Sequence, residues 1–115
     1  MISKELLNKV LNIEIVSYQM KQKNILAYEY NKVSKNQWSG KTFCNRSINT
    51  YELAHKCKEW ALKHHYKVIS KPDNVPGLWE AYVNLSLTSK HGEVADTEPE
   101  AIFKACQWIL DKDSK

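Results

Sequence analysis

One segment alternates apolar and polar residues over ten positions, and it constrains the fold more than any other part of the chain. Its apolar members are Trp79, Ala81, Val83, Leu85 and Leu87. Because successive side chains of a strand point to opposite faces, this alternation predicts a strand over residues 79–88 with one buried face. Such a strand needs neighbouring strands and a covering layer. We therefore expect it near the centre of a sheet on which helices pack.

Helices that could cover this sheet are indicated by N-terminal capping patterns. Asn49 is followed three residues later by Glu52, and Thr97 is followed by Glu100, which is the spacing of a capping box. Ser3 is a third capping residue, ahead of a shorter apolar stripe. These patterns predict helices over residues 3–12, 50–65 and 98–112. In the last helix the expected buried stripe consists of Ile102, Ala105, Cys106 and Ile109.

The remaining strands are expected mainly in the first half of the chain. Residues 13–20 and 24–30 predict a hairpin whose turn is the polar segment 21–24. The apolar positions change parity between Ile15 and Val16, which indicates a bulge or a twist. Residues 66–70 predict a short strand, and a weaker pattern suggests another over residues 42–47, whereas the acidic segment 91–98 is interpreted as a connection.

A chain of 115 residues corresponds to one domain, so residues 1–115 are taken as a single unit. The predicted class is α+β, with an antiparallel sheet of four to five strands, two main helices and a short N-terminal helix. No apolar run approaches the roughly 20 residues that a membrane helix needs. The charged N-terminus lacks the apolar core of a signal peptide. We therefore expect a cytoplasmic protein without a membrane partner.

Three segments, residues 51–54, 77–83 and 97–106, resemble the small α/β sandwich domains of phage and prophage proteins known as the phage ABA sandwich. Residues 48–61 are also similar to small hypothetical proteins of epsilonproteobacterial genomes. The resemblance implies a sandwich of strands and helices and a phage or prophage origin. It supplies no activity and no site residues.

The sequence contains no recognisable catalytic, metal or cofactor site. Cys44, Cys57 and Cys106 are isolated from one another and form no C-x-x-C pair. His91 and Glu93 match half of a zinc deaminase motif whose cysteine half is missing. The chain has three glycines in all, which argues against a glycine-rich phosphate-binding loop. We therefore predict a protein that is not an enzyme and holds neither a metal nor a cofactor.

Charge is distributed unevenly along the chain. Residues 1–71 hold 13 Lys or Arg and 5 acids, a net charge of +8, whereas residues 72–115 carry a net charge of −4. Basic and aromatic residues mix within the segment 21–46, as they do in single-strand nucleic-acid binders. The candidate binding surface consists of Lys21, Lys23, Tyr28, Tyr30, Trp38, Lys41 and Arg46.

Trp38 offers a second interpretation of the same region, because exposed tryptophans anchor protein interfaces. The favoured hypothesis is a small non-enzymatic interaction module that contacts an unidentified protein partner. The alternative is a weak nucleic-acid-binding protein that uses residues 21–46. The partner and the oligomeric state stay open.

Overall fold

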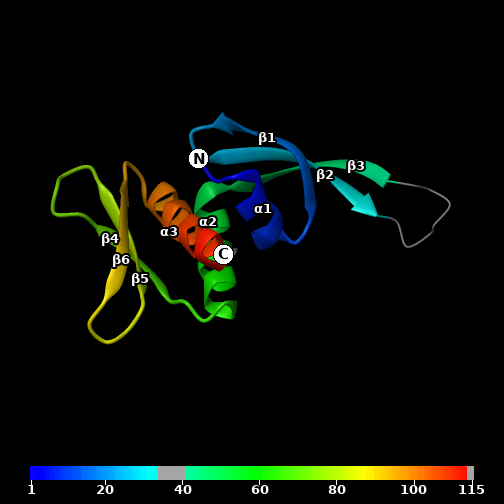
Figure 1. Cartoon of the computed structure of the whole chain (residues 1–115). Coiled ribbons are helices and arrows are strands. Elements are labelled where there is room, and N and C mark those ends of the chain that lie inside the picture. Colours follow the sequence, from blue (N-terminus) through cyan, green and yellow to red (C-terminus); the bar gives the residue numbers. More distant parts are fainter. Residues whose placement is uncertain (34–40, 114–115) are drawn as a thin grey trace.

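In the computed structural model, which describes residues 1–33 and 41–113, two three-stranded antiparallel sheets flank a pair of helices. The helices are α1 (Lys4–Leu11), α2 (Thr50–Lys63) and α3 (Glu98–Asp113). Sheet A contains β1 (Glu14–Gln22), β2 (Ile25–Val33) and β3 (Lys41–Asn49), and sheet B contains β4 (Val68–Pro72), β5 (Trp79–Asn84) and β6 (Lys90–Ala95). Figure 1 shows α2 and α3 side by side between the two sheets.

Each half of the chain follows the same topology, a meander of three strands and then a helix. Asn49 ends β3 and at the same time caps α2, accepting a hydrogen bond from the Tyr51 amide at 2.8 Å. Thr97 caps α3 in the second half, where its hydroxyl accepts from the Glu100 amide at 3.3 Å. These two predicted caps are confirmed, and they turn the chain sharply from sheet to helix.

The short helix α1 is held against sheet A by polar contacts at both of its ends. Ser3 caps its start and accepts from the Leu6 amide. At its end, the side chain of Asn8 accepts from the Ile15 amide of β1 at 2.8 Å. The Tyr18 hydroxyl donates to the Ile2 carbonyl at 2.9 Å. Leu6 and Leu7 are fully buried, so α1 belongs to the core.

Strand β1 contains the irregularity that the sequence predicted. Its pairing with β2 shifts register between Ile15 and Ser17, and again between Met20 and Gln22. The first shift moves the buried parity from Ile15 to Tyr18, which explains the change in the apolar pattern. A bulge also increases the local twist, and the second one leaves Lys21 outside the regular ladder.

Helix α3 is buried on more than one side, because it packs against α2 and also covers sheet B. The predicted stripe of Ile102, Ala105, Cys106 and Ile109 is buried as expected. Ala101, Phe103 and Leu110 are buried too, which widens the apolar surface beyond the stripe that one sheet would need. A helix with apolar side chains around so much of its circumference must lie between two layers.

The prediction of a single sheet of four to five strands is wrong, although the α+β class is confirmed. The two hairpin systems form separate sheets because α2 and α3 lie between them. Segment 91–98, which was interpreted as a connection, contains β6, the strand that pairs with β5. Strand β5 ends at Asn84 rather than near Thr88, and it is central in sheet B as predicted.

Shortening Ile109 tests the central position of α3. Its side chain is fully buried, so Ile109→Ala should lower the free energy of unfolding by about 3 kcal/mol through lost burial and a residual cavity. Leu62→Ala serves as the control, since Leu62 is 64% exposed on α2 and its loss should cost under about 0.5 kcal/mol. Urea unfolding measures both. A cost near the control value for Ile109→Ala would contradict the two-sided burial of α3.

Candidate functional site

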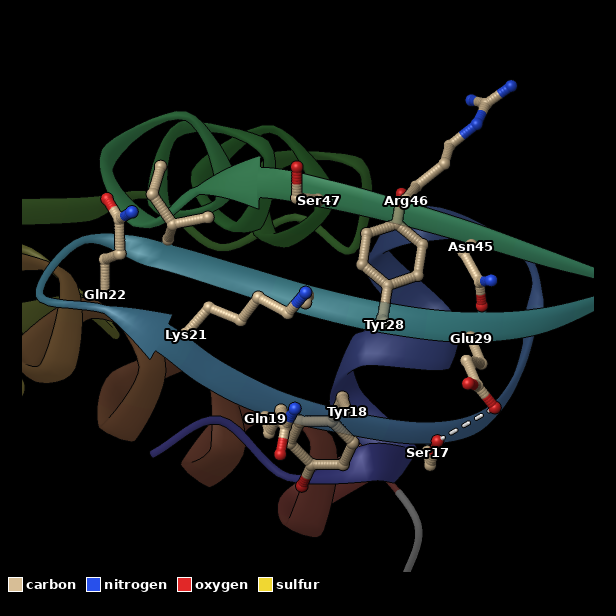
Figure 2. Close-up of a pocket in the computed structure, with 12 residues that line it drawn as sticks. Ser17, Tyr18, Gln19, Lys21, Gln22, Tyr28, Glu29, Asn45, Arg46 and Ser47 are labelled. Atoms are coloured by element: carbon tan, nitrogen blue, oxygen red, sulfur yellow. Dashed lines mark hydrogen bonds between the residues drawn. The ribbon is translucent and has the colours of Figure 1, made fainter.

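The outer face of sheet A, which points away from the helices, forms an open hollow of about 640 Å³ (Figure 2). The register of the strands determines which residues reach it. Ala27 of β2 lies between Gln19 of β1 and Ser47 of β3, and Glu29 lies between Ser17 and Asn45. Directly opposed residues share one face of a sheet. The pairing of β1, β2 and β3 therefore brings together floor residues that lie apart in the sequence.

Uncharged hydrogen-bonding groups dominate this floor. Ser17, Gln19, Asn45 and Ser47 are all exposed. Ser17 donates to the Glu29 carboxylate at 3.3 Å. In the part of the chain that the structure describes, the side chains of Gln19, Asn45 and Ser47 make no hydrogen bond. Their amide and hydroxyl groups thus remain able to donate to and accept from a ligand.

Cationic side chains stand at the margins of the hollow. Lys21 and Lys23 are exposed at the end of β1 and in the turn that follows it. Arg46 is exposed on β3, but it lies directly opposite Tyr28 and therefore belongs to the other face of the sheet; Figure 2 shows its side chain extending away from the floor. Its guanidinium lies 5.7 Å from the centre of the Tyr30 ring. The hollow therefore combines a largely neutral floor with a basic margin.

The two tyrosines of the predicted binding surface belong to the core. Tyr28 is 8% exposed and Tyr30 is 7% exposed, on the face of sheet A that packs toward the helices. Burial raises the pKa of the Tyr28 phenol, while the nearby positive charge of Arg46 opposes that rise. Rings buried to this extent present no open face to a nucleic-acid base. Of the predicted surface, the described side chains that remain accessible are Lys21, Lys23 and Arg46.

Two predicted residues cannot be placed in this surface. Trp38 lies outside the described residues. Lys41 begins β3, but its side chain also falls outside what the structure describes. The prediction that Trp38 anchors a partner accordingly remains a prediction.

Sequence reasoning missed the floor of the hollow because it searched for charge and aromatic rings. Gln19, Asn45 and Ser47 are unremarkable in sequence. They can be recognised by their place in the alternation of each strand. Each lies next to a buried or inward-facing residue, as Ser47 does beside Ile48, and therefore points outward. Recognising these residues required the pairing of β2 with β3, and the strand pattern of β3 is weak.

His55 and His91 each contact a single carboxylate and do not share a cluster. His55 contacts Glu59 at 2.8 Å on the surface of α2, and His91 contacts Glu93 at 3.0 Å. The His91 ring also stacks on Trp108 of α3, with 4.2 Å between ring centres. Within residues 1–33 and 41–113, no group of three His, Cys, Asp or Glu side chains could hold a metal ion.

Two of the three thiols lie at the contact between α2 and α3. Cys57 and Cys106 are fully buried, and the Cys106 thiol donates to the Cys57 carbonyl at 3.5 Å. The neighbouring Cys106 and burial together raise the pKa of the Cys57 thiol. A raised pKa lowers the fraction of reactive thiolate at neutral pH. These cysteines therefore serve packing rather than nucleophilic chemistry.

The chain matches no protein-family model, no curated protein and no solved structure. Its resemblance to phage sandwich domains consequently stays a prediction. None of the helices in the described ranges is long and apolar enough to cross a bilayer.

Thiol reactivity gives a direct check on these cysteine environments. Cys44 is partly exposed, whereas Cys57 and Cys106 are buried. In native protein at pH 8, a disulfide reagent such as DTNB should modify one thiol quickly and the other two only as the protein unfolds, because both of these thiols are fully buried. Cys44→Ser should remove the fast phase. Rapid modification of all three thiols in folded protein would contradict the burial of the α2–α3 contact.

Proposed function

We propose that this protein is a non-enzymatic nucleic-acid-binding protein that contacts a DNA duplex through the outer face of sheet A. The observation that carries the proposal is the hollow itself, with free amides and hydroxyls on its floor and cations at its margin. Phosphate contacts position a protein on DNA, and hydrogen bonds to base edges read sequence. The margin and the floor of the hollow supply these two kinds of contact.

The dimensions of two neighbouring strands of sheet A support this assignment. Strands lie about 4.8 Å apart, so two strands side by side occupy about 10 Å. The major groove of B-DNA is about 12 Å wide, and β-sheet readers place strands in it. Lys21 and Lys23 would then lie toward the phosphates at the β1 side of the sheet.

The floor residues have the chemistry of base readers. Gln and Asn pair with adenine through two hydrogen bonds, and Ser can donate or accept. Gln19, Asn45 and Ser47 therefore offer direct contacts, while the carboxylate of Glu29 can accept from the amino group of cytosine. The centre of a protein-protein interface is typically apolar and aromatic instead, which favours DNA over a protein for this face.

Neutralising the margin tests the phosphate contacts. Each phosphate contact on duplex DNA contributes about 0.9 to the slope of log affinity against log salt. Lys21→Gln combined with Lys23→Gln should therefore reduce the magnitude of that slope by about 1.8 and weaken binding at low salt, as measured by fluorescence anisotropy with a labelled duplex. Lys4→Gln with Lys9→Gln, on exposed positions of α1, makes the same charge change away from the hollow and should leave the slope unchanged.

The floor is tested with the variant Gln19→Ala/Asn45→Ala in a selection from a random duplex library. Wild-type protein should enrich a sequence motif, and the variant should bind with the same salt slope but lose that motif. Absence of duplex binding by wild-type protein at low salt would overturn the proposal, and so would equal effects of the hollow and α1 variants.

A second candidate function, contact with a protein partner, is favoured by the turn between β5 and β6. Leu87 is fully exposed at its tip, and Leu85 is 40% exposed. The turn is held by Ser86, whose hydroxyl accepts from the amides of Thr88 and Ser89 at 3.3 and 3.1 Å. Two leucines exposed on one hydrogen-bonded turn form an apolar surface, and exposed apolar surfaces mark sites of contact with other proteins.

Leu87→Ser tests this second candidate. A tagged wild-type chain should retain a stoichiometric protein from host lysate after nuclease treatment, and Leu87→Ser should lose that same protein. Val75→Ser is the matched control, because Val75 is 54% exposed in the loop at the other end of β5. Retention of the same proteins by all three forms would rule out Leu87 as an anchor.

A further inference from the structure

The outer face of sheet B carries an aromatic ring between two lysines. Tyr82 of β5 is half-buried and points away from α3, because its neighbours Ala81 and Val83 are fully buried on the helix side. The Lys90 ammonium lies 4.4 Å from the centre of the Tyr82 ring, and the Lys71 ammonium lies 5.7 Å from it. The ring is thus the centre of a small basic surface. Figure 1 shows sheet B at the opposite side of the helix pair from sheet A.

Positive charge exceeds negative charge on this face. Lys67, Lys71 and Lys90 are exposed around Tyr82. Among the described residues of sheet B, Glu80 is the acid on the same face as Tyr82. Lys67 and Lys71 come from the basic segment 1–71, whereas Lys90 comes from residues 72–115, which carry a net charge of −4. The pairing of β4, β5 and β6 brings these lysines to one face.

Space beside the ring comes from a glycine. Gly92 of β6 lies directly opposite Tyr82 in the ladder, so β6 places no side chain directly across from the phenol, although Lys90 of the same strand reaches the ring. A Cβ built at Gly92 would lie 3.4 Å from the Glu80 carboxylate oxygen, which is the mobile end of a side chain. The Glu80 carboxylate therefore borders this position, and a larger residue at Gly92 would crowd both the carboxylate and the ring.

We propose that the outer face of sheet B binds single-stranded nucleic acid, with one base stacked on Tyr82 and the adjacent phosphates held by Lys71 and Lys90. Stacking platforms on an open sheet combined with backbone-tracking cations are the usual means of binding single strands. Charge complementarity selects a polyanion, and the ring selects one whose bases are unpaired. This surface is separate from the hollow on sheet A and does not depend on duplex binding there.

Ligand binding requires the lysines to exchange partners. In the free protein both ammonium groups lie near the ring face, an exposed cation–π arrangement that is weaker than the stacking of a base. As the base stacks, each ammonium moves to a phosphate, so its charge stays paired. In the free protein the two ammonium groups therefore lie against the ring, and a bound nucleic-acid strand replaces them there.

Photochemical cross-linking tests the stacking directly. A single-stranded oligonucleotide of 5-iododeoxyuridine should cross-link under ultraviolet light to the ring against which it stacks, and mass spectrometry should place the adduct on Tyr82. Adducts located on other residues, with Tyr82 unmodified, would overturn the proposal. A duplex of the same length should give no Tyr82 adduct, which separates this surface from that of sheet A.

Affinity measurements with a labelled oligo-dT strand complete the test. Tyr82→Leu should weaken binding about tenfold, whereas Tyr82→Phe, which keeps the ring, should remain within about twofold of wild type. Lys71→Gln with Lys90→Gln should reduce the salt slope by about 1.4, since each single-strand phosphate contact contributes about 0.7. Gly92→Val should also weaken binding by filling the space beside the ring.

The Lys4→Gln/Lys9→Gln protein again provides the control of equal charge change. Equal binding by Tyr82→Leu and wild type would overturn the proposal, as would a loss shared by Tyr82→Phe. Loss of duplex binding in the sheet A variants, with single-strand binding intact, would support the sheet B surface alone. Absence of single-strand binding at Tyr82, with duplex binding intact, would overturn the sheet B proposal and leave that for sheet A.

Discussion

The contact between α2 and α3 is the interaction on which the arrangement of the rest depends. Each helix ends a meander of three strands, so packing one helix on the other joins the two halves of the chain. Cys57 and Cys106 lie at this contact and are fully buried. Ser70 adds a polar link, because it accepts from Lys58 of α2 and donates to Glu98 of α3. Hydrophobic burial and these hydrogen bonds hold both helices in the middle of the molecule.

This central helix pair leaves the far face of each sheet uncovered. A sheet with one face packed and one face solvated normally carries polar residues outward, but the two faces here differ in chemistry. Sheet A presents amides and hydroxyls, with Lys21 at the margin. Sheet B presents the ring of Tyr82 between two lysines. The first suits the edges of paired bases, and the second suits the face of an unpaired base.

Much of the local structure could be predicted from the sequence, because caps and alternation are properties of neighbouring residues. The caps at Ser3, Asn49 and Thr97 and the bulge in β1 were identified in this way. The division into two sheets was not, since the sequence does not state which hairpin lies beside which after an intervening helix. Strand β6 was missed because its acidic and glycine-containing sequence has few apolar residues, being at the edge of its sheet.

The candidate site shows the same limit. Exposed cations such as Lys21 were recognised by their charge, but Tyr28 and Tyr30 were assigned to a surface although they face the core. A tyrosine has the same sequence signature in either place, and only the strand register distinguishes them. The floor residues Gln19 and Asn45 became evident for the same reason, once β1, β2 and β3 were paired.

The most direct test of the DNA-binding assignment is amide NMR of isotopically labelled protein titrated with a short DNA duplex. The account predicts that the largest shifts occur at Ser17, Gln19, Asn45 and Ser47, with smaller ones at Lys21 and Lys23 and little change in α3 or sheet B. Shifts concentrated on α3, on the β5–β6 turn or on sheet B, with the hollow unaffected, would contradict it.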